Sequence, residues 1–264
     1  MTYRLRERHS TLAVWSLRLA ALSVPVLVIA AIGHRQNRID ATATYGAMAV
    51  GFGLAFLALL AAIGAFEAIW RDGRKGIRPA LGGLVLALAV LSIAAIGAWK
   101  VVAYPQLTDI STNPDDPPAF VAALAARGPD ARPLAPLTDD EIAEQREAYP
   151  DVVSRHFAVD PARVFDDAHN LVVARGWEIL GEKRPEEAQD IGTIEAVAIT
   201  PIFGFRQDVA IRVAPDGEGA LVDMRSAARN GAHDLGADAE RIRAFFADLD
   251  TSLQGIGDEP VQGE

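Results

Sequence analysis

The stretch that decides the fold is QDVAIRVAPDGEGALVDMRSAAR, residues 207–229. Apolar and polar side chains alternate on both sides of the central DGEG, residues 216–219. Alternation with a period of two is typical of a strand with one buried face, and a glycine-containing turn between two such runs indicates a hairpin. We therefore predict two adjacent antiparallel strands, 207–215 and 220–229.

The polar side of this hairpin concentrates ionic side chains. Alternation places Asp208 and Arg212 on one side of the first strand, and Asp223 and Arg225 on one side of the second. Opposite charges on neighbouring strands form salt bridges, which contribute at most about 1 kcal/mol each when they are exposed. We interpret this side as a solvated face with salt bridges; the alternative is a polar groove in which the arginines converge.

Further strands and helices are predicted around the hairpin. The helix after residue 160 has clear limits, because Asp160 suits the N-cap, Pro161 the first helical position and Gly176 the end. The remaining predicted elements are strands at 151–159, 177–183 and 193–200 and a closing helix at 234–253. The order β-α-β-β-β-β-α, with short turns between strands, predicts an α+β domain whose antiparallel sheet packs both helices on one face.

Four segments of this half of the chain carry a resemblance to a known family. They are LTDISTNPDDPPAF (107–120), VFDDAHNLVVARGWEI (164–179), GFRQDVAIRV (204–213) and DMRSAARNGAHDLGADAERIRAF (223–245). Together they resemble the family called domain of unknown function 1499, over about residues 104–250. The resemblance implies the fold and a position behind a few membrane spans, as in membrane-anchored bacterial members. It implies no activity, substrate or catalytic residue.

The first hundred residues contain three long apolar segments. They are residues 12–33, 46–66 and 80–99, and Arg18 in the first is their only charged residue. About 20 apolar residues are needed to cross a bilayer core as a helix, so we predict a three-span membrane anchor. The first segment also resembles a signal peptide, whose cleavage would leave two spans. We expect Gly53, Gly83 and Ala87 to let the helices approach closely.

Charge is distributed unevenly along the chain. Residues 1–102 contain 11 Lys/Arg and 4 Asp/Glu, whereas residues 103–264 contain 14 and 31. Basic loops stay on the cytoplasmic side of a membrane. The basic positions are Arg4, Arg6 and Arg8 at the N-terminus and Arg71, Arg74, Lys75 and Arg78 in the second loop. We therefore predict a multi-pass protein of the bacterial cytoplasmic (inner) membrane, with the N-terminus cytoplasmic and the C-terminal domain periplasmic.

These patterns divide the chain into four parts. The predicted parts are a three-span anchor at 1–102, a junction and linker at 103–150, an α+β outer domain at 151–253 and a disordered tail at 254–264. Short helices are predicted in the junction at 117–126 and 139–148, the second beginning with a capping box formed by Thr138 and Glu141.

Composition excludes several classes of partner and active site. An acidic C-terminal half argues against nucleic acid as a partner, because binding of phosphate backbones requires clustered Lys/Arg. The chain has no cysteine, which excludes thiolate catalysis and Cys-ligated metals. The acidic run around Asp109, Asn113 and Asp115 does not have the spacing of an EF-hand loop. We therefore expect no metal and no cofactor.

The candidate functional residues gather where the last strand turns into the last helix. Arg225 and Arg229 flank the helix N-terminus, which favours anions. With Arg212 and His233 they form the candidate anion site, while Asp234 is predicted to cap the helix. No recognisable catalytic motif is present, so we predict no catalytic residue.

Three functions are consistent with these features. The first is a membrane-anchored protein whose outer domain binds a partner protein or a small anionic envelope ligand, with the lipid bilayer as a further partner. The second is a periplasmic hydrolase or ligand-processing enzyme centred on Ser226, Arg229, His233 and Asp234. The third is a subunit of a larger membrane complex, contacted through its second and third spans.

Overall fold

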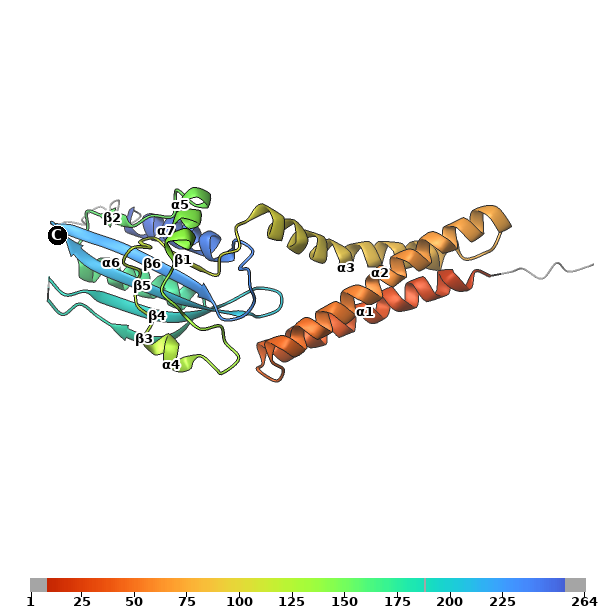
Figure 1. Cartoon of the computed structure of the whole chain (residues 1–264), viewed down its shortest axis with the longest axis horizontal. Coiled ribbons are helices and arrows are strands. Elements are labelled where there is room, and N and C mark those ends of the chain that lie inside the picture. Colours follow the sequence, from red (N-terminus) through yellow and green to blue (C-terminus); the bar gives the residue numbers. More distant parts are fainter. Residues whose placement is uncertain (1–8, 188, 255–264) are drawn as a thin grey trace, which may run out of the picture. The chain divides into compact units, whose positions relative to one another are not determined.

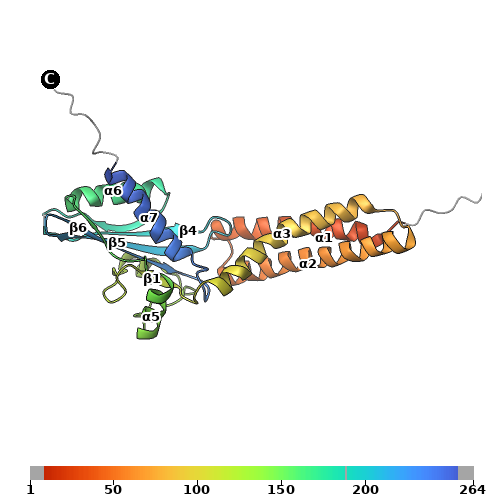
Figure 2. The same ribbon diagram turned by 90° about the horizontal axis from the view of Figure 1, so that it is seen from above.

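The structure, a computed structural model, describes residues 9–187 and 189–254 (Figures 1 and 2). It divides into two compact units, one formed by the chain up to Lys100 with Ile202–Gly204, the other by Val101–Pro201 with the chain from Phe205 onward. Of the disordered tail predicted at 254–264, Gln254 is the last residue of α7, and the rest lies outside the described residues, as do the N-terminal arginines 4, 6 and 8.

Three long helices form the first unit: α1 (Thr11–Arg35), α2 (Ala41–Asp72) and α3 (Ile77–Ala103). All three are long and apolar enough to cross a membrane, which confirms the predicted apolar helices. Polar side chains set where two of them begin, because Ser10 Oγ accepts from Ala13 N and Asp40 Oδ1 accepts from Ala43 N at 2.6 Å. Gly73, with φ +61°, ends α2 in the left-handed conformation that glycine adopts readily.

Small residues form the contacts among these helices. The buried small residues include Ala13, Ser16 and Ala20 of α1, Ala55, Ala58, Ala62 and Ala65 of α2, and Ala80, Gly83 and Ala87 of α3. Without side-chain bulk the backbones approach closely, which is how apolar helices associate in lipid. Gly83 and Ala87 are buried in these contacts, as predicted for small residues that let helices approach closely. Gly53 does not, since a Cβ there would meet nothing within 4 Å among the described residues, whereas one on Gly51 would meet Leu27.

The second unit is an α+β domain built on a six-stranded antiparallel sheet. The strands are β1 (Asp109–Ser111), β2 (Arg155–Phe157), β3 (Glu178–Lys183), β4 (Gly192–Ile199), β5 (Arg206–Asp216) and β6 (Gly219–Ala228). Their order is β1-β6-β5-β4-β3, with β2 also paired to β6. The predicted α+β fold and the order from β2 to α7 are confirmed. The short strand β1 was not predicted, because three residues are too few to show alternation.

Helices α6 (Pro161–Ala174) and α7 (Ala237–Gln254) cover one face of the sheet (Figure 2). Their apolar sides and the inward residues of β4, β5 and β6 form the main core. Phe245 of α7 is fully buried and stacks on Trp177, with 5.9 Å between ring centroids. Asp160 and Pro161 begin α6 as predicted, and Gly176 follows its last turn with φ +67°.

The opposite face of the sheet is covered by the segment between β1 and β2. This segment contains α4 (Ala122–Ala126), which packs on β3 and β4, and α5 (Asp139–Ala148), which begins with the predicted capping box of Thr138 and Glu141. Figure 2 shows α5 on the side of the sheet away from α6 and α7. The stretch interpreted from sequence as a junction therefore supplies a layer of the domain.

Candidate functional site

The covered face of the sheet is lined by arginines and carboxylates in buried pairs. The β5–β6 register places Arg212 directly opposite Asp223, as expected for cross-strand neighbours. Arg212 Nη2 lies 2.7 Å from Asp223 Oδ2, and Nη1 lies 2.8 Å from Asp116 Oδ2. Asp223 also accepts hydrogen bonds from Thr112 and Ser154. Asp223 is only 1% exposed whereas the Asp116 side chain is 76% exposed, so the network is buried at Asp223 and reaches solvent at Asp116. The sequence had indicated a face that is solvated throughout.

Arg225 is held by the first strand. Its Nε and Nη2 donate to Asp109 Oδ1 and Oδ2 at 2.9 and 2.6 Å, which is the bidentate geometry of a strong arginine–carboxylate pair. Its Cζ lies 4.8 Å from the centroid of the Phe120 ring, and Nη1 donates to the Pro118 carbonyl. The guanidinium is thus fully engaged by the covering segment.

Asp208 lies between two arginines. Arg229 donates from Nε and Nη2 to Asp208 Oδ1 at 2.9 and 2.6 Å, and Arg127 Nε donates to Oδ2 at 2.6 Å. The Asp208 side chain is 0% exposed. One carboxylate is therefore shared by two buried guanidinium groups, which leaves this cluster with one excess positive charge.

Glu195 of β4 fixes the start of α4 over the same face. Its carboxylate accepts from the backbone N–H groups of Val121, Ala122 and Ala123 at 2.8, 3.1 and 2.9 Å. These are donors at the first turn of a helix, which favours negative charge. The sheet thus holds the covering segment through both ion pairs and this acidic cap.

A small polar cavity opens beside the Asp208 cluster. Its volume is about 60 Å³, and Arg127, Arg132, Thr108, Asp109 and Glu141 lie among its lining residues. Arg127 Nε is engaged by Asp208 and Nη1 donates to the Arg132 carbonyl. Its Nη2 is buried and has no hydrogen-bond partner among the described residues. A buried donor without a partner costs about 1–3 kcal/mol.

The carboxylates that line this cavity are already bound to other groups. Asp109 pairs with Arg225, and Glu141 accepts from the Thr138 backbone N–H and hydroxyl at 2.8 and 2.9 Å. The hydrogen bonds from Thr138 lower the pKa of Glu141. Thr138 is neutral, so Glu141 keeps its negative charge and the lining holds two carboxylates and two arginines. When the partners Arg225, Arg229 and Asp208 are included, the groups at and next to the cavity carry a net charge of about +1.

Ser226 lies on the helix-covered face of the sheet, opposite to the arginine network. Its hydroxyl donates to Asp238 Oδ1 at 2.7 Å and accepts from Arg241 Nη1 at 2.9 Å. Burial raises the pKa of Asp238 well above its ordinary value of 3.8, and Arg241 opposes this shift. This small network joins β6 to α7.

Asp234 and His233 organise the turn that leads into α7. Asp234 lies three residues before Ala237, and its carboxylate accepts from the N–H groups of Gly236 and Asp238 at 3.0 and 2.9 Å. Burial raises its pKa, and these hydrogen bonds oppose the shift. His233 Nδ1 accepts a hydrogen bond from the Leu235 N–H at 2.9 Å, so the ring proton is on Nε2. Nε2 then donates to the Tyr104 carbonyl at 3.2 Å.

The residues of the hydrolase hypothesis do not meet in one place. Ser226 contacts α7, Arg229 contacts Asp208 on the other face of the sheet, and His233 is held by backbone groups through both ring nitrogens. A nucleophile and its base must lie within hydrogen-bond reach. Of the predicted anion-site residues, Arg212, Arg225 and Arg229 lie on one face, but each is already bound to a carboxylate.

The sequence did not single out the partners that complete these clusters. These are Asp109, Arg127, Arg132, Glu195 and Asp238. The sequence did contain a signal for Asp208, because a carboxylate next to the apolar run of β5 requires a counter-charge if it is buried. Nothing in the local sequence indicated that this counter-charge comes from residue 127.

Residues 109–249 match the model of the family described as Protein of unknown function (DUF1499). The chain belongs to this family. No curated protein matches the chain. The DUF1499 match begins at the first residue of β1 and ends in the last turns of α7, so the covering segment and its ion pairs lie within the family domain.

Proposed function

We propose that this DUF1499 protein is anchored by three spans in the bacterial cytoplasmic membrane and that its α+β domain binds a small oxyanion on the outer side. The oxyanion is the carboxylate or phosphate group of an envelope ligand. The observation that carries the binding site is the buried, unpartnered Nη2 of Arg127 beside a polar cavity.

The orientation is supported by the basic loop between α2 and α3. That loop and its helix ends contain Arg71, Arg74, Lys75 and Arg78, whereas the loop between α1 and α2 contains only Arg35 and Arg38 nearby. By the positive-inside rule the α2–α3 loop stays in the cytoplasm, and α3 then leads the chain outward. The acidic domain follows α3 directly.

Cysteine labelling tests this topology, since the chain has no cysteine of its own. We expect a membrane-impermeant maleimide to label Gln36→Cys and Thr251→Cys in intact spheroplasts. Asp72→Cys should react only after lysis, because its loop faces the cytoplasm. All three positions are exposed, so differences in labelling report on the side of the membrane. Labelling of Asp72→Cys before lysis would reverse the topology.

The oxyanion site is supported by size and charge together. A cavity of about 60 Å³ accommodates a few water molecules or one carboxylate or phosphate group. Charge-assisted hydrogen bonds from guanidinium groups to such oxygens are about twice as strong as neutral ones. The bound group would satisfy Arg127 Nη2 and meet Arg132, which is exposed at the opening. This site lies next to Ala228, immediately before the predicted anion-site residue Arg229.

Titration of the full chain in mild detergent with inorganic phosphate and with acetate tests the site. We expect saturable binding of at least one of them by calorimetry, and Arg132→Gln should weaken it at least tenfold, since one charged hydrogen bond contributes about 1.5–3 kcal/mol. Arg146→Gln is the matched control, because this exposed arginine pairs with Asp115 away from the cavity. Chloride at equal ionic strength controls for general salt effects.

Two outcomes would overturn the oxyanion proposal. One is binding that does not exceed the effect of chloride, which would assign the cavity to water. The other is an equal loss in both variants, which would mean that overall charge rather than the cavity binds the anion. A protein partner and membership of a larger membrane complex stay predictions from the sequence.

A further inference from the structure

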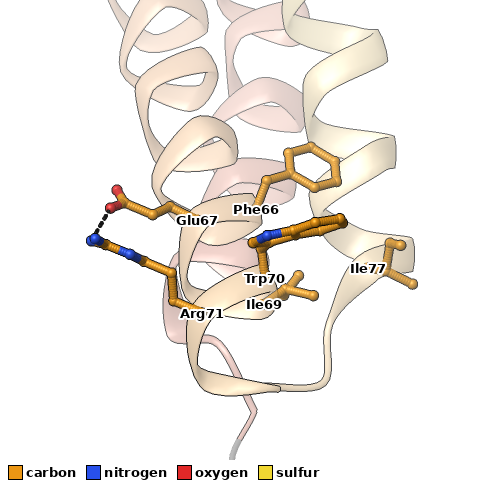
Figure 3. A pocket seen from close by; sticks show the side chains of 6 residues that line it. All are labelled: Phe66, Glu67, Ile69, Trp70, Arg71 and Ile77. Atoms are coloured by element: carbon orange, nitrogen blue, oxygen red, sulfur yellow. Dashed lines mark hydrogen bonds and ion pairs between the residues drawn. The ribbon is translucent and has the colours of Figure 1, made fainter.

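A second hollow lies in the helical unit, where α2 ends and α3 begins (Figure 3). Its volume is about 480 Å³. Its lining residues are Phe66, Glu67, Ile69, Trp70, Arg71 and Ile77. Figure 3 shows the rings of Phe66 and Trp70 on the side of α2 that faces α3, with Ile77 across from them. The lining is therefore mainly aromatic and aliphatic, and it belongs to two helix ends joined by a short loop.

The apolar residues of the hollow are accessible. Trp70 is 91% exposed and Ile77 is 59% exposed. A tryptophan at the end of an apolar helix is typical of the boundary between the hydrocarbon core and the headgroups. The hollow is open on its outer side, since Trp70 and Ile77 are largely exposed, and its size is sufficient for part of an acyl chain lying along the helices.

The charges around the hollow are mainly positive. Residues 66–78 contain four basic side chains, Arg71, Arg74, Lys75 and Arg78, and two acidic ones, Glu67 and Asp72. Glu67 pairs with Arg71 and Asp72 with Arg74, each at 2.8 Å. The segment therefore carries a net charge of about +2, which complements an anionic headgroup.

We propose that this hollow binds an anionic phospholipid, with an acyl chain against Trp70 and Ile77 and the headgroup phosphate at the loop of Arg74 and Lys75. The site rests on the proposed membrane spans, but not on the orientation or on the oxyanion site. The lipid fits better than a protein segment, because the apolar lining and the basic loop match the two halves of a phospholipid in their expected order along the helices.

Quenching of tryptophan fluorescence by brominated lipids tests the site. The full chain is reconstituted in phosphatidylcholine vesicles containing a small fraction of lipid with brominated acyl chains, either phosphatidylglycerol or phosphatidylcholine. The difference between the wild type and Trp70→Phe isolates the quenching of Trp70. We expect brominated phosphatidylglycerol to bind several-fold more strongly. The double change Arg74→Gln with Lys75→Gln should abolish this preference, because a basic residue near an anionic surface contributes about fivefold.

Arg38→Gln is the control, because it removes a basic charge from the loop at the other ends of α1 and α2. It should leave the preference unchanged. Equal quenching by the two lipids, or a preference that persists in the double variant, would overturn the lipid site while leaving the membrane spans intact. Failure of the protein to float with the vesicles would overturn the spans, and the lipid site with them.

Discussion

Replacement of Asp208 by Asn should lower the free energy of unfolding of the α+β unit by about 3–5 kcal/mol. The Asp208 side chain is fully buried and is the carboxylate partner of both Arg127 and Arg229. Their side chains are only 6% and 10% exposed, so water cannot replace the lost charge. Two buried positive charges would then lie close together without a counter-ion. Removal of one partner of a buried ion pair is strongly destabilising because it leaves uncompensated charge in the interior.

Pulse proteolysis of the full chain in mild detergent, at increasing urea concentration, measures this change through the surviving C-terminal domain. Asp248→Asn is the matched control, since Asp248 is 58% exposed and pairs with Arg175 at the surface. An exposed pair contributes about 0–1 kcal/mol, so the control should shift the midpoint only slightly. If the two variants unfolded at similar urea concentrations, the Asp208 cluster would not be a main support of the covering segment.

Local signals in the sequence predicted most elements of the domain. Asp160 and Pro161 begin α6, and the capping box of Thr138 and Glu141 begins α5, because these residues satisfy backbone groups within three or four positions. The hairpin of β5 and β6 followed from alternation and its turn, and alternation also placed Arg212 beside Asp223. Each of these features is decided by neighbours in the chain or by one tight turn.

The partners of Arg225 and Arg127 could not be predicted in this way. Asp109 and Arg225 are separated by 116 residues, and Arg127 and Asp208 by 81. Pairing over such distances depends on which segment covers the second face of the sheet. The covering segment is rich in proline and has few apolar residues in a periodic pattern, so its sequence predicts a linker. Its burial comes from ion pairs, from the Glu195 cap and from a small apolar cluster in which Phe120 and Ala123 pack on the sheet. These contacts leave no periodic signature.

In the helical unit, too, the local sequence predicts the elements but not the contacts between them. Hydropathy alone predicted three long helices, because each backbone must satisfy its hydrogen bonds internally. Which glycine lies in a contact depends on the rotation of the helices about their axes. Gly51 and Gly53 differ by two positions, about 200° around a helix, and only Gly51 faces Leu27. Choosing between them requires the packed structure.

Replacement of Gly83 by Leu should separate α3 from α1 and destabilise the helical unit by about 3 kcal/mol, the upper part of the range for overpacking. A Cβ at Gly83 would lie 2.7 Å from both the Leu17 nitrogen and the Ser16 carbonyl carbon. These are backbone atoms, which cannot move aside by changing a rotamer. The helices must therefore shift apart, and the small residues that pack along the same line lose contact with one another.

Cross-linking between α1 and α3 measures this separation. Ala20 and Ala87 are fully buried in one cluster, so Ala20→Cys with Ala87→Cys should form a disulfide on mild oxidation of the full chain. Adding Gly83→Leu should slow this reaction strongly. Gly53→Leu adds the same side chain to α2, where a Cβ meets nothing within 4 Å among the described residues, and should leave the reaction unchanged. Gly83 lies where α3 contacts α1, whereas Gly53 lies at no helix contact in the part of the chain that the structure describes. If both leucines slowed the disulfide equally, added apolar bulk in general would explain the effect, and the close α1–α3 contact at Gly83 would not be required.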